Sequence, residues 1–209
     1  MFTEIWSFLI KGGFLMIPLL ICSVLALAII IEKLITLRKN KVIVPEVKSV
    51  VENIGSEEDI KIALSVCSKH ESVLSNLIKV VLKHRGTSYT LMREELSDSG
   101  RQEVRTLEKG LGILETIAAV SPILGLLGTV VGMIKVFSVI SVQGVGEASA
   151  LSGGISEALI TTAVGLSVGI PSLIFYNYFT NKAEDLILDI ESISNNLLKK
   201  IISFRTEKK

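Results

Sequence analysis

Apolar, charge-free stretches alternate with charged segments along this chain, and three of these stretches are long enough to cross a lipid bilayer. They run over residues 12–31, 116–134 and 158–181, and a charged side chain bounds each end. A helix needs about 20 residues to span the hydrocarbon core. Because backbone groups in lipid must form their hydrogen bonds within the segment, each stretch is predicted to be a helix.

The first stretch lies near the N-terminus, where a cleaved signal peptide is the alternative interpretation. A signal peptide carries its basic residues before the apolar run. Here they follow it, at Lys33, Arg38, Lys39 and Lys41. We therefore expect a retained membrane span.

Lysine and arginine are distributed asymmetrically around the predicted spans. They follow the first span, precede the second and occur throughout the C-terminal tail, whereas the connector over residues 141–155 has none. The positive-inside rule therefore places the N-terminus and the connector outside. The predicted organisation is an outer N-terminus (1–11), transmembrane helix 1 (12–31), a cytoplasmic helical insertion (32–112), transmembrane helix 2 (113–142), a short outer loop (143–153), transmembrane helix 3 (154–181) and a cytoplasmic C-terminal helix (182–209).

Helix signals continue outside the predicted spans. Ser56, followed by three acidic residues, predicts a helix start, and Gly86 predicts a stop. From Thr90 onward, the apolar spacing predicts one helix that runs unbroken into the second span. Near the C-terminus, apolar residues alternate by four and three up to Leu197, with a last step of four to Ile201, as in a coiled-coil seam. These are Phe179, Ala183, Leu186, Ile190, Ile193, Leu197 and Ile201.

The expected fold class is an all-α integral membrane protein with three transmembrane helices. Helices 2 and 3 are predicted to be long and to extend side by side into the cytoplasm. For the tail, an amphipathic helix that lies on the membrane surface is the alternative.

Composition supports the membrane class and argues against several others. Hydrophobic residues make up 49% of the 209 residues, and the mean hydropathy is +0.57. A net charge of +1 with few aromatic residues does not suit a nucleic-acid binder. The sequence has no Walker loop, HExxH, GxSxG or paired CxxC motif, and His70 and His84 lie 14 residues apart with Cys67 as the single cysteine close to either of them. We therefore expect neither an enzyme nor a bound metal or cofactor.

Small residues share one face of the second span and one face of the third, taken at about 100° per residue. In the second span they are Ser121, Gly125, Gly128, Thr129 and Gly132. In the third they are Thr161, Thr162, Gly165 and Gly169. Helix packing alone explains such faces. The alternative is a polar path, because these faces carry hydroxyls and Glu157 stands at the outer end of the third span, although the helix dipole also favours a carboxylate there.

Other polar features of the spans limit what the chain can do alone. Pro122 and Pro171 each remove a backbone hydrogen bond and are expected to bend their helices. Lys135 is interpreted as an outer anchor. No aspartate or histidine occurs in the three charge-free stretches. A proton path needs a titratable group near mid-membrane, so another chain would have to supply it.

The segments SPILGLLGTVVGMIKVF (121–137) and GISEALITTAVGLSVGIPSLIFYNYF (154–179) resemble the paired signature of the MotA/TolQ/ExbB proton-channel family. The similarity is greatest to the ExbB/TolQ branch, and most of all to ExbB. It implies a bacterial inner-membrane subunit, with a periplasmic N-terminus and a cytoplasmic C-terminus, that forms a homo-oligomer, usually a pentamer. The ring would surround an ExbD/TolR-like single-span protein that carries a membrane aspartate, and would energise a TonB- or TolA-like protein.

By position in the motif, Thr129 and Thr162 match hydroxyls that line the inner face near that aspartate. Glu157 matches the pore-mouth glutamate, and Thr161 is a further pore-lining candidate. Besides energised outer-membrane transport, a TolQ-type role in envelope integrity and division is open, as is a passive helical scaffold in membrane lipid. A small-solute transporter is disfavoured, because the sequence shows no internal repeat or broken-helix pair.

Overall fold

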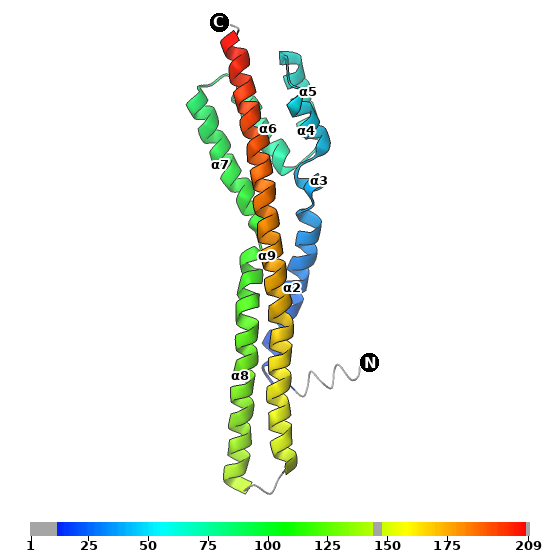
Figure 1. The fold of residues 1–209 in the computed structure, drawn as a ribbon, viewed down its shortest axis with the longest axis vertical. Helices are drawn as coiled ribbons and strands as arrows, with labels where there is room; N and C mark the ends of the chain where they lie inside the picture. The colour runs from blue at the N-terminus through cyan, green and yellow to red at the C-terminus, as the bar shows by residue number, and fades with distance from the viewer. Residues whose placement is uncertain (1–11, 144–147, 208–209) are drawn as a thin grey trace. The chain divides into compact units, whose positions relative to one another are not determined.

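The computed structural model describes residues 12–143 and 148–207, and within these ranges the chain forms helices and no strands (Figure 1). The helices are α2 (Met16–Thr36), α3 (Lys39–Val42), α4 (Pro45–Glu52), α5 (Glu57–Lys69), α6 (Val73–Lys83), α7 (Tyr89–Glu108), α8 (Leu111–Gln143) and α9 (Ala148–Glu207). Two expected segments lie wholly or partly outside the described residues: the outer N-terminus (1–11), and residues 144–147 of the outer loop expected at 143–153.

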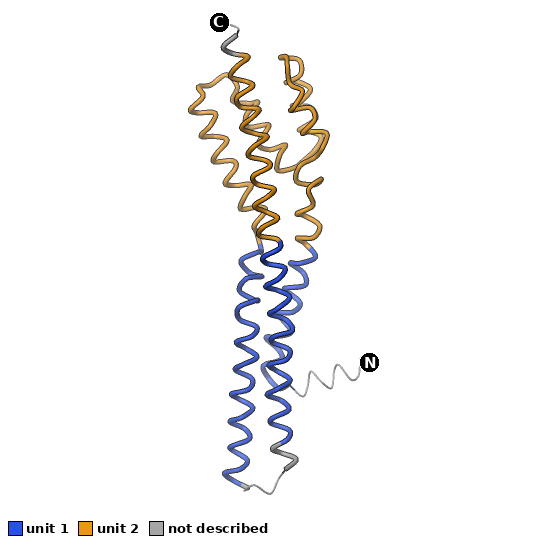
Figure 2. Tube along the Cα trace, in the orientation of Figure 1, with its two compact units in different colours: residues 1–31, 110–178 blue, residues 32–109, 179–209 orange. Residues whose placement is uncertain are grey.

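The chain divides into two compact units (Figure 2). Unit 1 comprises Met1–Ile31 and Gly110–Tyr178, and unit 2 comprises Glu32–Lys109 and Phe179–Lys209. Unit 1 therefore holds the apolar parts of α2, α8 and α9. Unit 2 holds the intervening short helices and the C-terminal part of α9.

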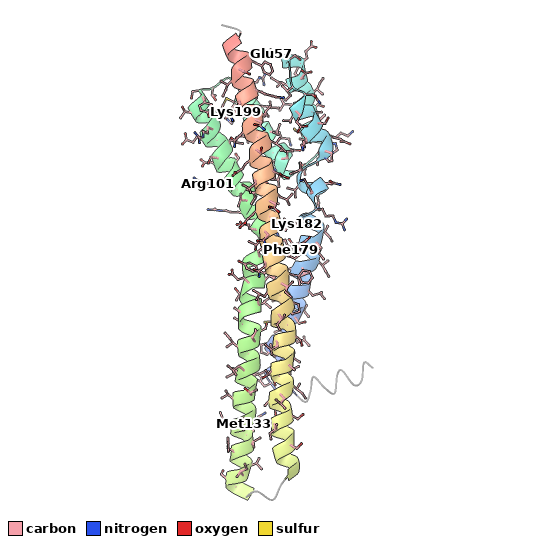
Figure 3. All side chains as sticks on the ribbon, in the orientation of Figure 1. Glu57, Arg101, Met133, Phe179, Lys182 and Lys199 are labelled. Atoms are coloured by element: carbon pink, nitrogen blue, oxygen red, sulfur yellow. The ribbon has the colours of Figure 1, made fainter. Side chains whose placement is uncertain are left out.

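The surface of unit 1 is suited to lipid. Helices α2, α8 and α9 are each long and apolar enough to cross a membrane. Large apolar side chains cover the outside of α8, where Ile123, Leu126 and Ile134 are 61–63% exposed. Figure 3 shows such side chains projecting from α8 and α9, with Met133 labelled on α8. Since a soluble protein rarely exposes so much contiguous apolar surface, the all-α membrane class is confirmed.

Helix α2 begins later than the predicted first residue of span 1. Gly13 has a positive φ of 71°, a conformation that glycine adopts without strain. The amide of Met16 donates to the Gly13 carbonyl at 3.1 Å, and the helix starts there. Pro18 falls in the first turn, where its missing N–H removes no helical hydrogen bond.

The prediction of one unbroken helix from Thr90 into the second span is wrong. Helix α7 ends at Glu108, and α8 starts afresh at Leu111. Gly110 between them has a φ of 89°. This left-handed conformation ends an α-helix, and glycine adopts it at no steric cost. In contrast, α9 continues without interruption through its whole length, as predicted, and starts at Ala148 instead of 154.

The coiled-coil-like seam of α9 forms part of the core of unit 2. Six of its seven residues are at least 94% buried: Phe179, Ala183, Leu186, Ile190, Leu197 and Ile201. Helix α6 contributes Leu74, Ile78 and Leu82, which are fully buried. Because the apolar face of the tail is covered by its own chain, the alternative of a surface-lying amphipathic helix is wrong.

Local capping explains where the helices of unit 2 begin. The helix start predicted at Ser56 is confirmed, and Ser56 and Asp59 form a capping box in which each side chain accepts from the other residue's backbone amide. Ser72 and Ser88 are the N-caps of α6 and α7, and each side chain accepts from the backbone amide three residues later. Helix α6 ends at Lys83, three residues before the predicted stop at Gly86. These caps position α5, α6 and α7 for packing.

Candidate functional site

Helices α8 and α9 of unit 1 are in backbone contact along a seam of small residues. A Cβ added at Gly128 would lie 2.5 Å from the Cβ of Thr161, and one added at Gly132 would lie 2.8 Å from the Cβ of Ala158. Real Cβ atoms essentially never come this close to another atom. Glycine is therefore required at both positions by the proximity of the two helices.

The seam continues toward the other end of the helix pair. A Cβ at Gly165 would lie 2.6 Å from the carbonyl oxygen of Ser121, and a Cβ at Gly169 would lie 2.6 Å from the Cγ of Pro122. Gly125 faces the backbone of Thr162, whose Cα would be 3.0 Å from an added Cβ. All five glycines expected to pack helices thus lie in this contact, and they pack within one chain.

The two prolines differ in their surroundings. Pro122, inside α8, lies against Gly169 of the neighbouring helix. Pro171, inside α9, is exposed. Both helices continue through their proline, and the bends expected at these positions stay predictions.

Thr161 is buried in the seam. Its side chain is 99% buried, and its hydroxyl lies 2.6 Å from the carbonyl of Glu157 and 3.1 Å from that of Gly12. The second contact links α9 to the turn that precedes α2. Thr161 therefore lies on the side of the helix pair that the start of α2 covers.

Thr162 and Thr129 lie on the opposite edge of the pair. The Thr162 hydroxyl donates to the Gly125 carbonyl across the seam at 2.9 Å, and the Thr129 hydroxyl donates to Leu126 in its own helix at 2.6 Å. Each threonine follows a residue of the Gly128–Thr161 contact, and consecutive residues of a helix project about 100° apart. Because the helices run antiparallel, this step brings both threonines to the same edge. Both are partly exposed. We call the surface formed by Thr129 and Thr162 the hydroxyl edge.

Glu157 has a partner that was not predicted from the sequence. Its Oε1 atom lies 2.5 Å from the Nζ atom of Lys135. The Glu157 side chain is 21% exposed and that of Lys135 52%. The carboxylate also lies directly beside Gly13, where an added Cβ would overlap it. The lysine expected to act as an outer anchor thus neutralises the glutamate expected at the pore mouth.

Two further polar residues are buried, one that the sequence placed on the small-residue face and one whose burial the sequence did not predict. Ser121 is fully buried, and its Oγ atom has no hydrogen-bond partner among the described residues. In unit 2, the ammonium of Lys33 is buried and donates to the carbonyl of Leu107 at 2.8 Å, near the end of α7. A cation here stabilises carbonyls that the end of a helix leaves unpaired. The residues described hold no cluster of His, Cys, Asp and Glu suited to a metal ion.

The profile of the MotA/TolQ/ExbB proton channel family matches residues 69–192, from the end of α5 into the C-terminal part of α9. The chain belongs to this family. It is 35% identical over 175 residues to putative biopolymer transport protein ExbB-like 3 of Synechocystis sp., a match that covers 80% of this chain and 81% of the relative.

Two other relatives show the same similarity to ExbB. Putative biopolymer transport protein ExbB-like 1 of Synechocystis sp. is 33% identical, over 80% of this chain and 67% of the relative. Biopolymer transport protein ExbB of Aquifex aeolicus is 40% identical over 95 residues, which cover 46% of this chain and 64% of the relative. The resemblance stated from the motifs is confirmed, and the chain is an ExbB-like membrane protein of a proton channel family.

Proposed function

We propose that this MotA/TolQ/ExbB family member is the ring-forming subunit of a motor driven by the proton-motive force in the bacterial inner membrane. Several copies, five in our proposal, surround the span of an ExbD/TolR-like protein that carries a membrane aspartate. Proton flow through that aspartate energises a TonB-type protein and outer-membrane transport. The N-terminus is periplasmic in this proposal, and the C-terminus is cytoplasmic.

The hydroxyl edge is the observation that carries this proposal. Thr129 and Thr162 are polar groups on the unit 1 parts of α8 and α9, whose other exposed side chains are largely apolar. The start of α2 covers the opposite edge through Thr161, so this edge is open to a further helix. A polar edge within a membrane span is costly unless it faces a partner or water.

Hydroxyl chemistry suits the proposed contact with a titrating carboxyl group. Each threonine hydroxyl now donates to a helix carbonyl, which leaves its oxygen lone pairs free to accept. A protonated partner carboxyl could therefore donate to Thr129 or Thr162 without breaking the bonds within this chain. After the proton leaves, either hydroxyl can rotate to donate to the carboxylate. The threonines would thus position the partner's carboxyl group in both protonation states.

The Lys135–Glu157 pair has a separate place in the proposal. At the outer end of the spans it presents no net charge, and Glu157 remains partly exposed. Because the two charges are paired, no isolated charge lies at the entrance, where it would be energetically costly near the membrane. We propose that Glu157 stands at the pore mouth and that Lys135 holds its carboxylate in place.

The hydroxyl edge is tested by Thr129→Val and Thr162→Val, which keep side-chain shape and remove the hydroxyl. The chain is co-expressed with an ExbD/TolR-like partner from the same organism, and energised outer-membrane uptake is measured together with oligomer size. We expect assembled complexes and at least about tenfold lower uptake, the effect of losing roughly 1.4 kcal/mol from a rate-limiting contact. Thr129→Ser and Thr162→Ser should retain most of the uptake.

Thr116→Val is the matched control. Thr116 is exposed on α8 and its hydroxyl donates to the carbonyl of Gly112, one turn back in its own helix, at 2.8 Å, so it has a local bond similar to that of Thr129 at a position away from the seam. The variant should leave uptake unchanged. Full uptake in both the Thr129→Val and Thr162→Val variants would refute the proposed role of the hydroxyl edge.

A passive helical scaffold is the second candidate function, and the tight glycine seam favours it. The seam is fully occupied within one chain, so it explains the small residues without any ion flow. A scaffold would tolerate the loss of both hydroxyls and would fail when Gly128→Leu separates α8 from α9. The motor would fail under either change.

A further inference from the structure

A groove in unit 2 is lined in part by arginine side chains. It has a volume of about 590 Å³ and is lined by α7 and α9, with Leu77 of α6. Clefts of this size commonly hold small molecules. Three of the lining residues are arginines of α7, namely Arg93, Arg101 and Arg105. Figure 3 labels Arg101 on α7.

The guanidinium groups of this groove are available to a ligand. Within residues 12–143 and 148–207, none of the three takes part in a hydrogen bond or ion pair. Ser194 of α9 also lines the groove and is 99% buried, and its Oγ atom has no hydrogen-bond partner in the part of the chain that the structure describes. A buried hydroxyl without a partner is costly, and a ligand that accepts its proton would remove that cost.

We propose that the groove between α7 and α9 binds a small phosphate-bearing anion. Arg101 and Arg105 are four residues apart, about 6 Å along the helix, and can both reach one phosphate group. Arg93 lies two turns before Arg101, about 12 Å along the helix, and its long side chain can reach the far end of a diphosphate. The Ser194 hydroxyl supplies a further donor from the opposite wall.

The other charged residues of the groove narrow the class of ligand. Glu108 and Glu191 also line it, so its formal charge is only one positive unit, from three arginines and two glutamates. An extended polyanion such as a nucleic acid would meet these carboxylates. A compact phosphate or diphosphate group can contact the arginines and avoid them. The source of the phosphate is either a soluble metabolite or a phospholipid headgroup.

Gly100 provides a direct way to close the groove. It lies on the lining, in the middle of α7, and an added Cβ would meet nothing within 4 Å. Gly100→Leu should therefore fold and place its side chain in the groove. Gln102→Leu is the matched control, because Gln102 is exposed on the same helix, projects about 200° away from Gly100 and does not line the groove.

Binding is measured by calorimetry on the full-length protein in detergent, with inorganic pyrophosphate as the probe. We expect saturable binding by the wild type. Arg101→Gln should raise the Kd by at least about tenfold, as expected for one lost charge-assisted hydrogen bond. Gly100→Leu should abolish binding. Gln102→Leu and Arg85→Gln, which alters an arginine outside the groove, should bind like the wild type.

Nanodiscs distinguish the two sources of phosphate. If the natural ligand is soluble, the Kd for pyrophosphate will be the same in phosphatidylcholine discs and in discs that contain phosphatidylglycerol. If it is a headgroup, the anionic lipid will compete and raise the Kd. Absence of saturable binding in detergent would overturn the proposal, as would binding that neither Arg101→Gln nor Gly100→Leu weakens. This result is independent of the proposed motor, because uptake is not measured.

Discussion

Gly165→Ala tests whether α8 and α9 are held at backbone contact. The added methyl carbon would lie 2.6 Å from the carbonyl oxygen of Ser121 and 2.9 Å from the Cα of Gly125. Both are backbone atoms, so no side-chain rotation can relieve the overlap. The helices would have to move apart by several tenths of an ångström or more.

The cost of that movement follows from what the seam contains. Overpacking a close contact costs about 1–3 kcal/mol. Separation also lengthens the bond from the Thr162 hydroxyl to the Gly125 carbonyl, now 2.9 Å, and such a bond in a membrane protein contributes about 0.6 kcal/mol. Replacing glycine by alanine stabilises a helix by up to about 1 kcal/mol, which offsets part of this loss. We therefore expect a net loss of about 1–3 kcal/mol.

The assay is equilibrium unfolding of the detergent-solubilised protein, followed by circular dichroism. Gly112→Ala in α8 is the control, because an added Cβ there meets nothing within 4 Å and should leave stability unchanged or slightly raised. Equal stability of the Gly165→Ala and Gly112→Ala variants would refute the backbone contact.

Three predictions concern unit 2. Ser56→Ala removes the capping hydroxyl of α5 and should cost about 1 kcal/mol in the same unfolding assay. Backbone hydrogen bonding from Gly55, with help from Ser56, holds the pKa of Asp59 below its ordinary value of 3.8. Its stabilising effect is therefore present above pH 3.8 and lost as the pH falls through the lower pKa, and a pH 7 to pH 2 series should show a loss that Asp59→Asn lacks. Burial raises the pKa of the Cys67 thiol. In a Cys22→Ser background, maleimide should modify folded Cys67 at least roughly tenfold more slowly than the urea-unfolded chain, and equal rates would contradict its burial.

The membrane helices could be predicted from sequence because lipid imposes a simple rule on composition and length. The seam of α9 was predictable for a similar reason, since Phe179 and Leu186 are one heptad apart and both are buried. The break between α7 and α8 was missed, although Gly110 was visible in the sequence. Glycine also occurs inside helices here, as at Gly128, so its presence alone does not decide between a break and a close contact.

The candidate site was only partly predictable. Helical periodicity grouped Thr161 with Thr162, but it could not say which would be covered, because that depends on where the chain before α2 passes. The pair between Lys135 and Glu157 joins residues 22 positions apart on different helices. The buried hydrogen bond from Lys33 to Leu107 spans 74 positions. Local patterns do not encode such tertiary contacts.

The division of roles between Thr161 and Thr162 has a consequence for how this protein can change over time. The Thr161 hydroxyl contacts carbonyls of its own chain, at Gly12 and Glu157. The side chains that this position tolerates are therefore determined by this gene alone. If the hydroxyl edge meets a second protein, the requirements at Thr162 and Thr129 are set partly by another gene. Exchanging the partner for a distant homologue should then select compensating substitutions at Thr129 or Thr162 and leave the neighbouring Thr161 unchanged.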